Sequence, residues 1–153
     1  MRKITTFITF DGHGKEAVDL YTATFKNSKI ISVMTHPETG TLLHALFTLD
    51  GQHFMAMDGG KHFTFTDGFS LFIDCKSQEE VDYYWEKLTA DGGAPGSCGW
   101  LKDKFGVSWQ VVPEILGQLI ADPNPAKSQA VMQAMLKMGK INIAELQAAY
   151  DKA

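Results

Sequence analysis

The sequence predicts an α+β fold: paired βαβββ modules forming curled mixed sheets around a pocket, followed by a C-terminal helical tail. Strand-like and helical segments run through the same order twice, and everything after Pro113 is helical in pattern. The two predicted module helices carry matching apolar stripes at an offset of 64 residues, namely Ala17, Leu20, Tyr21, Thr24 and Val81, Tyr84, Trp85, Leu88. We expect a domain over 1–113, with modules 1–65 and 66–113, and a tail over 114–153 packed on the domain or on a partner subunit.

The first module is predicted to contain a strand, a helix and three further strands. Residues 3–10 are rich in Ile, Thr and Phe, and a turn at 11–14 precedes the helix. The further strands are expected over 29–35, 41–49 and 52–58. Asp50-Gly51, between the last two, is a strong signal for a two-residue hairpin.

The second module begins with a strand over 69–75. Ser77 and Glu80 form a capping box, which predicts a helix from that point. A glycine-rich segment over 91–99 then leads to a short strand over 100–103 and a last strand over 107–112. In the tail we expect a helix over 114–121, a second that begins at Asn124-Pro125, and a third capped by Asn142.

Composition excludes several classes of protein. Of 153 residues, 44% are hydrophobic and 21% charged, which is typical of a globular domain. The net charge is −4 and the basic residues are scattered, so we expect no nucleic-acid partner. The start of the chain shows no apolar signal segment and no run is long enough to span a bilayer, so we expect a cytoplasmic protein without a membrane partner. Cys75 and Cys98 form no CxxC motif, so neither a disulfide framework nor a zinc site is expected.

Several long motifs resemble a known family. They include GQHFMAMDGG over 51–60, GFSLFIDC over 68–75 and CGWLKDKFGVSWQVVP over 98–113. They are similar to the PhnB-like family of the glyoxalase, bleomycin-resistance and extradiol-dioxygenase superfamily, also called vicinal oxygen chelate, whose members often carry the label demethylubiquinone methyltransferase. The resemblance implies a homodimer and, for the enzymes of the superfamily, a divalent metal held by His, Glu or Gln ligands.

The positions that match those ligands carry other residues. They fall near Thr5 and Thr6, at 68–70, and at Gln110, where a metal-binding Glu usually stands. None is a His or a carboxylate, so we expect no metal and no cofactor. His44 and His53, on either side of the Asp50-Gly51 turn, need not face the same side of the sheet.

Strand alternation organises the candidate pocket. Ser108, Gln110 and Val112 share one face of the last strand, and Trp109 lies on the other. The resemblance turns Gln110 toward the concave side, which would pack Trp109 under a helix. On the fourth strand either Phe54 and Asp58 or the two methionines line the pocket. The predicted ligand-binding residues are Gln110, Phe54, Asp58, Phe10, Trp100, Lys102 and Cys98.

Three functions remain open at this point. The first is a small-molecule-binding protein with an apolar, aromatic-lined pocket and no metal. The alternative is a metal-dependent lyase, isomerase or dioxygenase acting on a small oxygen-rich substrate. The third is a structural or regulatory partner that docks through the methionine-rich helix 126–138. Methyl transfer is disfavoured because no strand leads into the G-x-G-x-x-G turn that often marks a site for S-adenosylmethionine.

Overall fold

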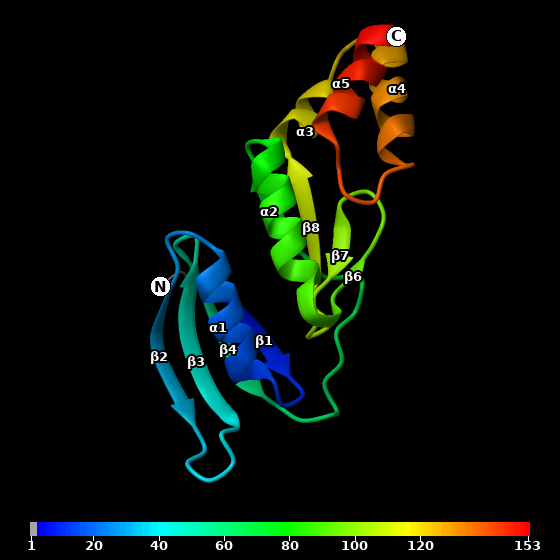
Figure 1. Ribbon diagram of the computed structural model, residues 1–153. Helices are drawn as coiled ribbons and strands as arrows, with labels where there is room; N and C mark the ends of the chain where they lie inside the picture. The colour runs from blue at the N-terminus through cyan, green and yellow to red at the C-terminus, as the bar shows by residue number, and fades with distance from the viewer. Residues whose placement is uncertain (1–2) are drawn as a thin grey trace. The chain divides into compact units, whose positions relative to one another are not determined.

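The chain forms two compact units, Met1–Thr64 and Phe65–Ala153, in a computed structural model that describes residues 3–153 (Figure 1). Each unit contains a four-stranded mixed sheet and a helix that packs on one face of it. The predicted α+β fold with two βαβββ segments and C-terminal helices is therefore confirmed. Residues 1 and 2 of the expected first module lie outside the described residues. None of the described helices has the length and hydrophobicity of a membrane span.

The first unit follows the predicted order. Its elements are β1 (Thr6–Phe10), α1 (Gly14–Thr24), β2 (Lys29–Thr35), β3 (Leu42–Leu49) and β4 (Gln52–Asp58). The strand order is β1-β4-β3-β2, with β1 parallel to β4 and the other pairs antiparallel. The first strand begins at Thr6 and is shorter than the predicted range 3–10. Asp50 and Gly51 have φ values of 47° and 76°, as a type I′ hairpin requires, so the predicted turn is confirmed.

The two faces of the first sheet differ in burial. The side under α1 forms the core, because alternate residues of each strand point the same way; its buried members include Ile8, Phe10, Ala45, Phe47, Phe54 and Ala56. The other side, here called the open face, carries Phe7, Met55 and Met57, and Phe7 is 47% exposed.

The second unit repeats the plan with shorter strands. It contains β5 (Leu71–Cys75), α2 (Gln78–Thr89), β6 (Ala94–Pro95), β7 (Trp100–Lys102) and β8 (Ser108–Pro113), in the sheet order β5-β8-β7-β6. The two-residue strand β6 and the 3-10 turn Ala90–Gly92 were not predicted. Ser77 caps α2 by accepting a hydrogen bond from the Glu80 amide, 3.3 Å away, as the capping box predicts. Glu80 reaches back one residue further than expected, to the amide of Lys76, at 2.8 Å.

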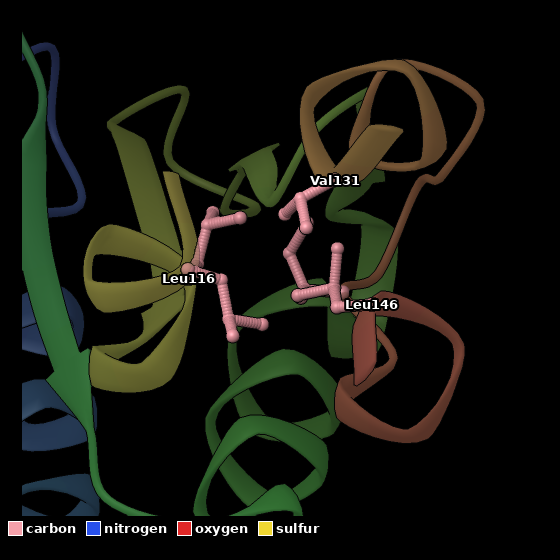
Figure 2. Close-up of a cluster of buried hydrophobic side chains, with 5 residues drawn as sticks. Leu116, Val131 and Leu146 are labelled. Atoms are coloured by element: carbon pink, nitrogen blue, oxygen red, sulfur yellow. The ribbon is translucent and has the colours of Figure 1, made fainter. Parts of the chain in front are cut away.

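Three helices complete the second unit, which contains the whole tail. They are α3 (Glu114–Ile120), α4 (Pro125–Met135) and α5 (Ile143–Lys152). Asn124 and Asn142 cap the last two, as predicted. Side chains from all three helices and the α4–α5 loop meet in one buried cluster, in which Figure 2 labels Leu116, Val131 and Leu146. The tail therefore has an apolar core of its own, and Val112 of β8 packs against it.

Candidate functional site

The second sheet also has an open face, the side turned away from α2. It holds three of the predicted ligand-binding residues. Trp100 pairs with Gln110 across β7 and β8, and Lys102 pairs with Ser108. Paired residues lie on the same side of a sheet, so these four side chains share one face. Phe72 of β5, paired with Gln110 from the other side, extends this face and is 59% exposed.

A pocket of about 380 Å³ opens on this face beside β7. Trp100 contributes an aromatic wall, and the ammonium of Lys102 lies 2.7 Å from a carboxylate oxygen of Asp67. The remaining lining comes from β7 itself, from the neighbouring strands β6 and β8 and from the β6–β7 loop, with Leu101, Ala94, Ser108 and Gly96. The site therefore combines a flat apolar surface with an exposed ion pair.

Gln110 lies next to the pocket rather than in its lining. Its side-chain amide donates a hydrogen bond to the hydroxyl of Ser70, 2.9 Å away. Trp109, the neighbouring residue, points to the opposite side, where it is only 2% exposed and packs between the sheet and α2. The predicted alternation is thus confirmed, with Trp109 on the side that α2 covers and Gln110 on the other. That the Gln110 side is concave stays a prediction.

The residues on this face do not fit the divalent metal that the superfamily resemblance implies. The donor atoms that Ser70, Ser108 and Gln110 offer are neutral, and the Asp67 carboxylate is paired with the Lys102 ammonium at 2.7 Å. Divalent metals in proteins are held mainly by imidazoles, thiolates and carboxylates. Among residues 3–153, no three His, Cys, Asp or Glu side chains gather closely enough to hold a metal ion. We therefore derive no chemical step through a metal.

The two strand histidines share a face without forming a pair. His53 pairs with Thr48 in the β3–β4 ladder, while His44 lies four residues earlier on β3, so both project to the open face of the first sheet. At about 3.3 Å per residue they are separated by roughly 13 Å along the strands. They do not form a two-histidine ligand set.

Three predicted site residues occupy structural positions in the first unit. Phe10 and Phe54 are 1% and 4% exposed, in the core under α1. Asp58 accepts hydrogen bonds from the amides of Gly14 and Leu42, both at 2.8 Å, and so ties the start of α1 to β3. Their side chains lie on the helix side of the sheet, and the ligand-binding role given to them stays a prediction.

Cys98 lies at the turn before β7. Its φ is 56°, its thiol side chain is half-buried, and its amide donates to the carbonyl of Met138 at 2.8 Å. The position is thus set by contact with the tail. Burial raises the pKa of the other thiol, Cys75, to about 12, and the nearby carboxylates of Glu80 and Asp74 add to the effect. A thiol with so high a pKa is not a nucleophile near neutral pH.

The comparisons with known proteins agree with this architecture. A model of the family described as 3-demethylubiquinone-9 3-methyltransferase matches residues 2–112. The chain belongs to this family. A PhnB protein from Bacillus cereus that carries the same description is 41% identical to it, with a TM-score of 0.69, over 73% of this chain and 99% of the other. No curated protein matched.

Two more distant structures share the fold. A protein from Pseudomonas aeruginosa is 20% identical, with a TM-score of 0.59, over 74% of this chain and 98% of its own. The fosfomycin resistance protein FosX from Listeria monocytogenes, solved with Mn(II) and sulfate, is 17% identical, with a TM-score of 0.52, over 71% and 90%. At these identities the likeness concerns the fold alone.

Sequence reasoning missed part of the pocket lining. Asp67, Ala94 and Gly96 come from irregular segments or from the two-residue strand β6, which have no periodic pattern. The sequence did contain one local signal, the glycine-rich stretch 91–99, because glycine allows one backbone segment to approach another closely. A β-carbon at Gly96 would lie 2.7 Å from the carbonyl oxygen of Trp100, so the close approach of this loop to β7 requires glycine.

Proposed function

We propose that this family member binds a small amphipathic molecule on the open face of its second sheet, without a metal. The pocket beside Trp100 carries the proposal. Its volume of about 380 Å³ suits a small ligand. A planar apolar group would stack on the Trp100 indole. The Lys102 ammonium now lies 2.7 Å from the Asp67 carboxylate, and an anionic group of the ligand would replace that carboxylate as its partner.

The proposal is tested with benzoate, a ring with a carboxylate, titrated into the full chain and followed by backbone and indole N–H chemical shifts. We expect saturable shifts at residues 94–102 and at the Trp100 indole. Lys102→Ala should weaken binding about tenfold, which corresponds to about 1.4 kcal/mol. Asp67→Asn should strengthen it, because it frees the Lys102 ammonium from its present partner.

The control is Lys87→Ala, which removes another exposed cation, one that lies over the Tyr83 ring on α2. It should leave benzoate affinity unchanged. Equal weakening in the Lys102 and Lys87 variants, or shifts that spread over both units without saturation, would contradict a defined site. Mass spectrometry of denatured protein then identifies any natural ligand that copurifies.

A metal-dependent lyase, isomerase or dioxygenase remains the competing function. What supports it is the fold shared with FosX, which was solved with Mn(II). Elemental analysis of freshly purified protein separates the two. Zinc, iron, nickel or manganese at one equivalent per chain would overturn the metal-free proposal.

Methyl transfer, the activity in the family's description, has less support in this chain. The described strands form two four-stranded mixed sheets rather than a doubly wound parallel sheet with a glycine-rich turn. Isothermal titration with S-adenosylmethionine decides this point, and micromolar binding would restore the activity as a candidate.

The proposal includes a homodimer. Its support is the apolar character of the open faces, where Phe7 and Phe72 are 47% and 59% exposed, and of the edge strand β2, where Met34 is 62% exposed. Apolar surface of this kind in a native protein marks interaction sites. Light scattering of the full chain should give twice the mass of 16.9 kDa, and a monomer at all concentrations would end this part of the proposal.

A further inference from the structure

The helical tail touches the wall of the proposed ligand pocket through one short segment. The amides of Cys98 and Gly99 donate hydrogen bonds to the carbonyls of Met138 and Gly139, each at 2.8 Å. Figure 1 shows the α4–α5 loop lying beside the loop that joins β6 to β7. The turn that leads into Trp100 is therefore held in place by two backbone hydrogen bonds to the tail.

Gly139 lies beside Gly96, one of the residues that line the pocket. A β-carbon built on it would lie 3.2 Å from the carbonyl oxygen of Gly96, which is tighter than an ordinary contact. Gly96 lines the pocket, and its amide donates to the carbonyl of Trp100 at 2.9 Å. Gly139 thus lies beside Gly96, with no room for a side chain between them, and Gly96 is hydrogen-bonded to Trp100.

A second set of contacts fixes this segment of the tail to α2. The side-chain amide of Gln78 donates to the carbonyl of Ile141 at 3.1 Å and accepts from the amide of Ile143 at 2.8 Å. The ammonium of Lys140 lies 2.6 Å from a carboxylate oxygen of Asp82, one turn along α2. Ile141 of this segment is also fully buried. Residues 138–143 are therefore held by α2 on one side and by the β6–β7 loop on the other, and can support that loop.

The family model stops before this support begins. It matches residues 2–112, whereas the contacts come from residues 138–143. The pocket wall in this chain therefore depends on a part of the sequence that the family model does not include.

We propose that Gly139 is a positioning residue of the pocket, through which the tail sets the location of the Trp100 wall and hence the affinity for the ligand. The effect on affinity rests on the proposed function, whereas the effect on the location of Trp100 does not, so the two can fail separately.

The experiment compares Gly139→Ala and Gly139→Val with the wild type in the full chain. The added side chain should push the Gly96 carbonyl away and carry Trp100 with it. We expect the Trp100 indole N–H resonance to move, more for Val than for Ala, while the indoles of Trp85 and Trp109 stay in place. Amide exchange at Cys98 and Gly99 should quicken at least tenfold, and benzoate should bind about tenfold more weakly to Gly139→Val.

Gly117→Ala is the matched control. Gly117 lies on α3 in the same tail, and a β-carbon there meets nothing within 4 Å. It should leave the Trp100 resonance, the exchange rates and the benzoate affinity unchanged. If Gly139→Val also loosens α5, seen as faster exchange at Leu146, then Gly139→Ala decides, because its smaller side chain adds only the 3.2 Å contact.

The outcomes are separable. An unmoved Trp100 resonance in both Gly139 variants overturns the positioning role whatever benzoate does. A moved resonance with unchanged benzoate affinity overturns the link to binding. A moved resonance in a protein whose wild type does not bind benzoate supports the positioning role and counts against the proposed function.

Discussion

The indole N–H of Trp109 donates a hydrogen bond to the carboxylate of Asp103 at 2.8 Å, and both residues are at least 97% buried. The other carboxylate oxygen accepts from the amides of Phe105 and Val107, at 2.9 and 3.0 Å. One side chain thus closes the β7–β8 turn and anchors the tryptophan beneath the sheet. The same two strands carry Trp100, Lys102 and Ser108 of the pocket on their opposite face, so the Asp103 contacts also help to position the pocket.

Asp103→Ala should destabilise the second unit by about 3 kcal/mol, because it leaves three donors, two of them buried, without that acceptor. Unfolding in urea followed by tryptophan fluorescence measures it, since Trp85, Trp100 and Trp109 all belong to this unit. Asp67→Ala, which removes only an exposed ion pair, should cost less than 1 kcal/mol. Similar losses in the two variants would mean that Asp103 does not organise the turn.

Gly99→Ala should destabilise the same unit by about 3 kcal/mol. Its φ of +84° costs a side chain about 1–2 kcal/mol, and the new β-carbon would lie 2.8 Å from the carbonyl oxygen of Val111. Gly106→Ala is the control, with a φ of +87° but no atom nearer than 3.6 Å. We expect Gly106→Ala to lose only the free energy of unfolding that its positive φ costs. An equal loss of unfolding free energy in urea for both variants would show that the contact with the Val111 carbonyl contributes nothing.

The tail should be sensitive to acid through Asp122 and Tyr150, whose hydroxyl donates to the Asp122 carboxylate at 2.6 Å. This hydrogen bond lowers the pKa of Asp122 and raises the pKa of Tyr150. A lowered carboxyl pKa stabilises the fold above the unfolded pKa, about 3.9, and the contribution is lost as the pH falls through the folded pKa. The raised pKa of the Tyr150 phenol stabilises the fold below the unfolded pKa, about 10, and this contribution is lost as the pH rises through the folded pKa.

Tyr150→Phe should therefore reduce Tm near pH 7, and the reduction should be smaller near pH 2, below the unfolded pKa of the Asp122 carboxyl. Thermal unfolding at the two pH values measures the difference. The comparison variant is Gln147→Ala, which removes an exposed hydrogen bond to Asp151 one turn away on α5. A Tyr150→Phe effect of the same size at both pH values would show that ring packing, rather than the hydrogen bond, is responsible.

The cysteines should differ in reactivity. Burial raises the pKa of Cys75 to about 12, so at pH 8 its thiolate fraction is about a thousandfold below that of a free peptide thiol. Iodoacetamide on native protein should therefore label Cys98 first and leave Cys75 unlabelled until the protein is unfolded. Peptide mapping checks this, and early labelling of Cys75 would show that the second unit opens readily. If Cys98 reacts no faster than a free peptide thiol, a nucleophilic role for it is excluded.

The sequence alone determined the order of the elements in both units, except for the 3-10 turn Ala90–Gly92 and the short strand β6. Hydrophobic period, capping residues such as Ser77, Asn124 and Asn142, and the Asp50-Gly51 turn are local signals, and local signals fix local structure. Alternation on β8 also separated Gln110 from Trp109 correctly, because a strand has a strict two-residue period.

Only the tertiary structure decided which face of β4 is the core and which residues form the pocket. Phe54 and the methionines of β4 are all apolar, so alternation separates them but cannot say which side α1 covers. Asp67, Gly96 and Gly139 are far apart in sequence and lie in irregular segments, where no period predicts contact. Gly96 meets Trp100 across the β6–β7 turn, and Asp67 is held there by its ion pair with Lys102. Gly139 comes beside them because the tail docks on the β6–β7 loop through backbone atoms, a non-local contact that the side-chain pattern cannot show.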